Sequence, residues 1–147
     1  MASLAEIRTA LRATLKAAIP VLNVYAQVPD VSQLPAVVVL PAPPSSSGFV
    51  CEFNGAFGRG LDTWHLDLYV LVGRAEAALA QQALDQYVTG TGSKSIRRIF
   101  YENPDLGLGD GTDAHVEGIR EYGGEFSTAQ IPNVGAVVRL TVRTSST

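Results

Sequence analysis

The hydrophobic residues near the start of the chain recur in a helical pattern. Apolar side chains follow one another at steps of three and four residues, which places them on one stripe of a helix: Leu4, Ile7, Leu11, Leu15 and Ile19. Ser3 and Glu6 have the spacing of a capping box, and Pro20 is incompatible with a continuing helix. The pattern predicts a helix over residues 3–19 whose apolar stripe covers a sheet.

Strand patterns follow in the next fifty residues. Residues 21–28 alternate between apolar and polar side chains, as in a half-buried strand, and residues 36–40 are apolar on both faces, as in a central strand. Residues 49–53 are compatible with an extended conformation. The clearest alternation is in residues 61–72, where one face carries Trp64, Leu66, Leu68, Val70 and Val72 and the other Thr63, His65, Asp67, Tyr69 and Leu71. We expect Trp64 and Tyr69 to pack on the sheet.

Two segments between these strands have the composition of loops. Residues 41–48 contain three prolines and three serines and predict a mobile, extended loop. Residues 54–60 contain three glycines and predict a turn. Together with the flanking strands, this turn predicts a long protruding hairpin whose tip spans about residues 54–62.

The second half of the chain predicts two helices and two strands. Residues 74–88 are helical by propensity, and Ser93 can cap a short helix that ends near Glu102. Residues 114–122 and 134–143 fit strands, with a polar, glycine-containing stretch between them. We therefore expect a single α+β domain over residues 1–147. Its mixed, mainly antiparallel sheet of about five to six strands would be covered by the N-terminal helix and a central helix pair.

Composition narrows the function classes. Apolar residues make up 46% and charged residues 17% of the 147 residues, which excludes a disordered tail. Eleven basic against fourteen acidic residues give a net charge of −3, which argues against a polybasic nucleic-acid binder. The one cysteine, Cys51, cannot form an internal disulfide and indicates a reducing compartment. Charged residues interrupt the first twenty positions, so we expect neither a signal peptide nor a membrane segment. We expect the protein to be located in the cytoplasm.

Candidate ligand sites are weak in this sequence. Gly90–Ser95 has a superficial likeness to a phosphate loop, but Ser93 stands where that loop needs the glycine before Lys94, so we expect a helix-to-helix connection. The oxygen-bearing side chains that follow match no EF-hand spacing and are expected in a solvated turn: Asn103, Asp105, Asp110, Asp113 and Glu117. We expect neither a metal nor a cofactor.

Nucleophilic chemistry has equally little support. His65 and His115 are the only histidines, Cys51 is the only thiol, and they are dispersed along the chain. Ser45–Ser47 lies in a proline-rich loop, unlike a nucleophile elbow. We therefore expect no catalytic residues and no enzyme. A small-ligand domain or an enzyme remains an alternative.

A series of short blocks resembles a family of viral structural proteins. The blocks are S-L-x-x-I-R-x-x-L from Ser3, V-Y from Val24, V-P-D from Val28, P-A-V-V from Pro35 with Pro41 after it, F-G-R-G-x-D from Phe57, V-L-V-G-R-A from Val70, A-Q-x-x-L-D-x-Y from Ala80, and Ser93 at the head of the next helix. Their order and spacing over residues 3–125 resemble the tail terminator (minor tail, tail-completion) proteins of long non-contractile-tailed bacteriophages. Residues 130–133 depart from the resemblance.

The resemblance implies a structural virion protein without catalytic chemistry. Such a protein assembles as a homohexameric ring on the end of the tail tube, stops polymerisation of the major tail tube protein, and presents a surface to the head–tail connector protein. DNA would only pass through the lumen, and the ring would form in the host cytoplasm and remain at the tail end of the virion. A head–tail connector or adaptor protein of the neck is the alternative.

Two exposed segments are the expected contact elements of such a ring. We expect the hairpin tip to contribute Phe57, Arg59 and Asp62, and the proline-rich loop to contribute Pro43 and Pro44. Arg59 is the leading charged contact, because a guanidinium on a glycine-rich tip can pair bidentately with a partner carboxylate.

Overall fold

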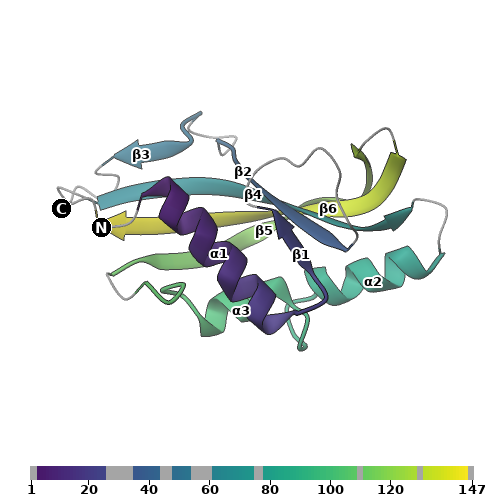
Figure 1. The fold of residues 1–147 in the computed structure, drawn as a ribbon. Helices are drawn as coiled ribbons and strands as arrows, with labels where there is room; N and C mark the ends of the chain where they lie inside the picture. The colour runs from purple at the N-terminus through teal and green to yellow at the C-terminus, as the bar shows by residue number, and fades with distance from the viewer. Residues whose placement is uncertain are drawn as a thin grey trace.

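Three helices and a six-stranded sheet make up the described part of the chain (Figure 1). The computed structural model describes residues 3–25, 35–43, 48–53, 61–74, 78–108, 111–128 and 131–145. In chain order the elements are α1 (Leu4–Ala18), β1 (Asn23–Tyr25), β2 (Ala36–Pro41), β3 (Cys51–Phe53), β4 (Leu61–Arg74), α2 (Ala78–Val88), α3 (Ile96–Glu102), β5 (Asp113–Thr128) and β6 (Ile131–Ser145). The α+β class expected from the sequence is confirmed.

The sheet is mixed and mostly antiparallel. Its order is β1-β2-β4-β6-β5, and β3 pairs with β4 beyond the end of β2. Only β1 and β2 run parallel. The first four residues of β2 are buried, as expected for a strand that is apolar on both faces and lies between two others.

All three helices cover one face of this sheet (Figure 1). The stripe predicted for α1 is buried at Ile7, Leu11 and Leu15, and the amide nitrogen of Glu6 donates a hydrogen bond to Ser3 Oγ at 3.2 Å. The sheet residues facing the helices alternate along β4 and β6, as predicted, and are buried in one core cluster: Leu66, Leu68, Val70, Val134, Ala136, Val138, Leu140 and Val142. Alternation in the sequence therefore identifies the core face correctly.

The helix pair begins later than the sequence predicts. Arg74, where the sequence predicts helix, still belongs to β4, and Ala78 is the first described residue of α2. Ser95, and not Ser93, caps α3, since its Oγ accepts a hydrogen bond from the amide nitrogen of Arg98 at 3.2 Å. Gly92 adopts a φ of 107°, which only glycine adopts readily, and this turn leaves Ser93 exposed outside the helix.

The last two strands are longer than predicted. The polar stretch expected between residues 122 and 134 is mostly strand, because β5 continues to Thr128 and β6 begins at Ile131. Two register shifts in β5 lie between Val116 and Gly118 and between Arg120 and Gly124. They interrupt the alternation of apolar and polar residues, so the sequence pattern underestimates the length of the strand. Figure 1 shows β5 and β6 bending away from the helices at this end.

The hairpin predicted before β4 is only partly within the described residues. Cys51, Glu52 and Phe53 pair with Trp64, Thr63 and Asp62, so β3 and β4 form its base. Residues 54–60 at its tip lie outside the described residues, as do residues 44–47 of the predicted mobile loop. The protrusion of the hairpin and the mobility of the loop stay predictions.

We expect Leu68→Ala to lower the free energy of unfolding by about 2–5 kcal/mol, because Leu68 is fully buried where β4 faces the helices. Urea denaturation of the two chains measures the difference. Val21→Ala is the matched control, since Val21 is 60% exposed and its truncation leaves no cavity. Equal destabilisation by the two variants would contradict the assignment of the core face.

Candidate functional site

Strand β3 attaches to the sheet where β2 ends. β2 pairs with Leu66–Leu71 of β4, and β3 pairs with Asp62–Trp64, which His65 separates from that segment. The backbone of His65 joins the two segments: its amide donates to the carbonyl of Val50 at 2.9 Å, and its carbonyl accepts from the amide of Ala42 at 3.1 Å. One position of β4 thus anchors both ends of the predicted proline-rich loop.

Two aromatic side chains are exposed on and beside β3. Phe49 is 63% and Phe53 71% exposed. Cys51 and Phe53 project from the same side of the strand, and Asp62 lies opposite Phe53. We call Phe49, Cys51, Phe53 and Asp62 the β3 surface. Single exposed hydrophobic residues are common on monomers, but aromatic side chains are enriched in the cores of protein interfaces.

The outer edge of β3 has no strand partner in the part of the chain that the structure describes. Because Val50 accepts the bond from His65, the alternation of an antiparallel ladder directs the N–H and C=O groups of Cys51 and Phe53 away from β4. Within the described residues, β3 has β4 as its sole strand partner. Free edges of this kind can accept a strand from another chain.

An ion pair on the other side of β3 holds it to β4. His65 Nε2 lies 2.8 Å from Glu52 Oε2, and the His65 side chain is only 7% exposed. The sequence places His65 on the second face of β4, but Glu52 is not among the candidates it suggests. The β3–β4 register brings the two side chains to the same side, and no motif in the sequence specifies that register.

The electrostatics of the β3 surface suppress ionisation of its thiol. Burial, and to a smaller extent the carboxylates of Asp62 and Glu52, raise the pKa of Cys51 to about 11. The side chain is therefore a neutral thiol near pH 7 and a poor nucleophile, since the thiolate is the reactive form.

A fully buried carboxylate lies on the sheet face opposite the helices. Asp67 Oδ1 accepts a hydrogen bond from Arg139 Nε, and its Oδ2 accepts one from Arg120 Nη2, both at 2.6 Å. The hydrogen bond to Asp67 raises the pKa of Arg120. The two guanidinium groups come from β6 and β5, so this triad links the three longest strands. Alternation in the sequence assigns Asp67 and Arg139 to the correct face of the sheet. The face of Arg120 depends on the bulge between Val116 and Gly118, which the sequence does not reveal.

The interface residues predicted from the sequence are only partly described. Asp62 lies in β4, partly buried, opposite Phe53 and Thr144, and Pro43 is exposed. Phe57, Arg59 and Pro44 lie outside the described residues. The structure therefore places Asp62 opposite the exposed Phe53, which the sequence did not select, and the other predicted contacts stay predictions.

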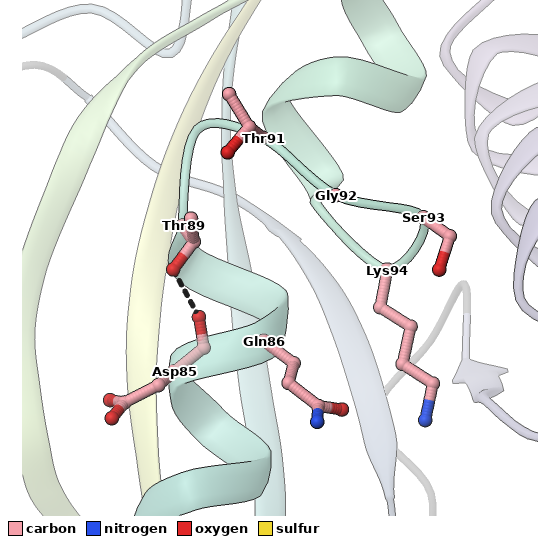
Figure 2. A pocket seen from close by; sticks show the side chains of 7 residues that line it. All are labelled: Asp85, Gln86, Thr89, Thr91, Gly92, Ser93 and Lys94. Atoms are coloured by element: carbon pink, nitrogen blue, oxygen red, sulfur yellow. Dashed lines mark hydrogen bonds between the residues drawn. The ribbon is translucent and has the colours of Figure 1, made fainter.

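The turn between α2 and α3, which resembles a phosphate loop in sequence, lies between two hollows. One hollow of about 460 Å³ includes Gln86 and Lys94, and the other, of about 490 Å³, includes Arg97 and Tyr101. Figure 2 shows Gln86 and Lys94 pointing to the same side of the first hollow. Ser95 Oγ donates to the carbonyl oxygen of Thr89, so the segment is a fixed helix-to-helix connection, as expected.

Comparison of the sequence with protein-family models and with curated proteins gives no match. Among the described residues, no three histidine, cysteine, aspartate or glutamate side chains gather as they would around a metal ion. None of the helices α1, α2 and α3 has the length and apolar character that crossing a membrane requires.

We expect Asp67→Asn to lower the free energy of unfolding by about 3–5 kcal/mol, because it leaves the charge of Arg139, which is only 14% exposed, without its partner. Chemical denaturation measures the loss. Glu102→Gln breaks an exposed pair with Arg98 and should cost less than about 1 kcal/mol. The triad is not a stabilising unit if both variants unfold at the same denaturant concentration.

The raised pKa of Cys51 should slow alkylation of its thiol in the folded chain. At pH 8.5 the folded chain should react with iodoacetamide on the order of a hundredfold more slowly than the chain unfolded in urea, because a rise of about two pKa units reduces the thiolate fraction by that factor. The rate should still be rising at pH 10. Asp62→Asn removes a negative neighbour, lowers the pKa and speeds the reaction at pH 8.5. A rate that levels off below pH 9 would contradict the assignment.

Proposed function

We propose that this chain is a structural subunit that assembles into a closed ring and terminates the tail tube of a long non-contractile-tailed bacteriophage. The ordered blocks over residues 3–125 that resemble tail terminator proteins motivate the proposal. The exposed β3 surface, with Phe49 and Phe53 beside a free strand edge, is the observation that carries it.

The β3 surface has the properties of a protein contact. Aromatic anchors supply much of the binding energy of interfaces once they are desolvated, and a free strand edge adds backbone hydrogen bonds. β3 also lies directly between the two segments predicted to make contacts, the loop at residues 41–48 and the tip at residues 54–62. The contact elements are thus consecutive in the chain.

A ring requires subunits that hold a fixed angle to one another, because a head-to-tail contact closes only when the rotation per subunit is constant. The described residues favour such rigidity. The Asp67 triad links β4, β5 and β6, and the His65–Glu52 pair fixes β3 to β4. A contact made by β3 would therefore be rigidly coupled to the rest of the sheet.

The experiment uses purified major tail tube protein, which is polymerised with and without this chain and imaged by electron microscopy. The proposal expects tubes of limited length with a ring on one end. Tubes that grow to indefinite length in its presence would refute the terminator role. If the chain binds isolated connector complexes and leaves tube growth unaffected, the neck-adaptor alternative is correct.

Phe53→Ser should weaken capping by at least about tenfold, since truncation of an aromatic hot spot costs about 2 kcal/mol or more of binding free energy. The melting temperature should be nearly unchanged because Phe53 is 71% exposed. Val21→Ser is the matched control, as Val21 is 60% exposed in the connection between α1 and β1. Equal capping by both variants would remove β3 from the contact with the tube.

A further inference from the structure

Charge is segregated along the second half of the chain. Three of the eleven basic residues fall within residues 94–98. Residues 102–125 contain seven of the fourteen acidic residues and one basic residue, Arg120, which is bound to Asp67. Opposite charges thus gather in neighbouring segments of a chain whose net charge is small.

The basic residues lie at the turn between α2 and α3. Arg97 and Tyr101 line the hollow of about 490 Å³, and Tyr101 is 84% exposed. The Arg97 guanidinium packs against Gly90. A side chain at position 90 would place its Cβ 2.9 Å from Arg97 Nη1. Lys94 lines the hollow of about 460 Å³, where Figure 2 shows it pointing to the same side as Gln86. Within the described residues, Lys94 and Arg97 have no acidic partner, whereas Arg98 is paired with Glu102. We call Lys94 and Arg97 the basic turn.

The acidic residues lie along β5, the edge strand of the sheet in the described part of the chain. β5 is the outermost strand next to β6, and Asp113 and Glu117 are exposed on it. Glu117 is the extra residue of the bulge between Val116 and Gly118. In the described part of the chain neither carboxylate has a basic partner within ion-pair distance. We call Asp113 and Glu117 the acidic edge.

The two surfaces lie apart on the molecule. The start of β5 pairs with the end of β6, as Asp113 lies opposite Arg143, and Figure 1 shows this end of the sheet away from the α2–α3 turn. Among the described residues, no ion pair joins the acidic edge to the basic turn of the same subunit. Two copies could not bind through the same surface of each, because like charges would face one another.

From this charge arrangement we infer that copies of this chain bind head-to-tail, with the basic turn of one copy against the acidic edge of the next. The inference rests on the proposed ring and names the contact between its subunits. Two unpaired cations meet two unpaired carboxylates of a different surface, which is a heterologous contact of the kind that closes rings. The contact with the tube remains a separate one, at β3.

The test measures the native mass of the purified chain at low salt without any tube protein. The wild type should assemble, and the assembly should weaken as salt is raised. The double variant Lys94→Glu/Arg97→Glu and the double variant Asp113→Lys/Glu117→Lys should each associate at least about tenfold more weakly. An equimolar mixture of the two should associate again, because each new charge then faces its opposite. Arg12→Glu, on the exposed side of α1, is the control and should assemble as the wild type does.

Several outcomes would overturn the inference. These are a wild type that stays monomeric at low salt, charge-reversed variants that assemble normally, and correctly folded variants whose mixture does not associate. Binding of short DNA duplexes to the basic turn by a monomeric wild type would also overturn it. Rings that form through this contact and fail to cap tubes would refute the proposed function alone. Rings that cap tubes and are insensitive to charge reversal would refute the inference alone.

Discussion

The buried carboxylate of Asp67 is the interaction on which the geometry of the sheet depends. It accepts hydrogen bonds at 2.6 Å from guanidinium groups of β5 and β6, so one side chain of β4 links the three longest strands across this face. A buried ion pair adds little net stability when compared with a well-packed apolar cluster, but an unpartnered buried charge is costly. The triad therefore selects one register: a shifted strand would leave a charge on this face without a partner.

Part of this architecture can be predicted from the sequence. Period-3.6 spacing identifies α1, and alternation in β4 and β6 identifies the buried face, because in each case the hydrophobic pattern lies within one element. The position of Arg120 could not be predicted, since the bulge before it changes which face it occupies. Glu52 was missed for a related reason, as its pairing with His65 follows from the register of β3 against β4. Contacts between strands depend on registers that alternation alone does not specify.

The described residues offer two kinds of contact, an apolar one at β3 and a charged one formed by the basic turn and the acidic edge. Among the described residues, Phe49 and Phe53 lie beside an edge of β3 that has no strand partner, whereas the basic turn and the acidic edge carry charges of opposite sign without ion-pair partners. In the proposed ring the first surface would contact the tube and the second would join neighbouring subunits. Apolar contacts would then supply affinity for the tube, while charge would set the order and direction of assembly.

We propose that the chain acts by assembling on the end of a tube with β3 toward it. The most direct measurement is an electron cryomicroscopy reconstruction of tail-tube ends after addition of this chain. The account predicts a closed ring of identical subunits, with Phe49 and Phe53 buried against the last layer of tube protein. Tube ends without an added ring, or a ring whose β3 surface faces solvent, would contradict it.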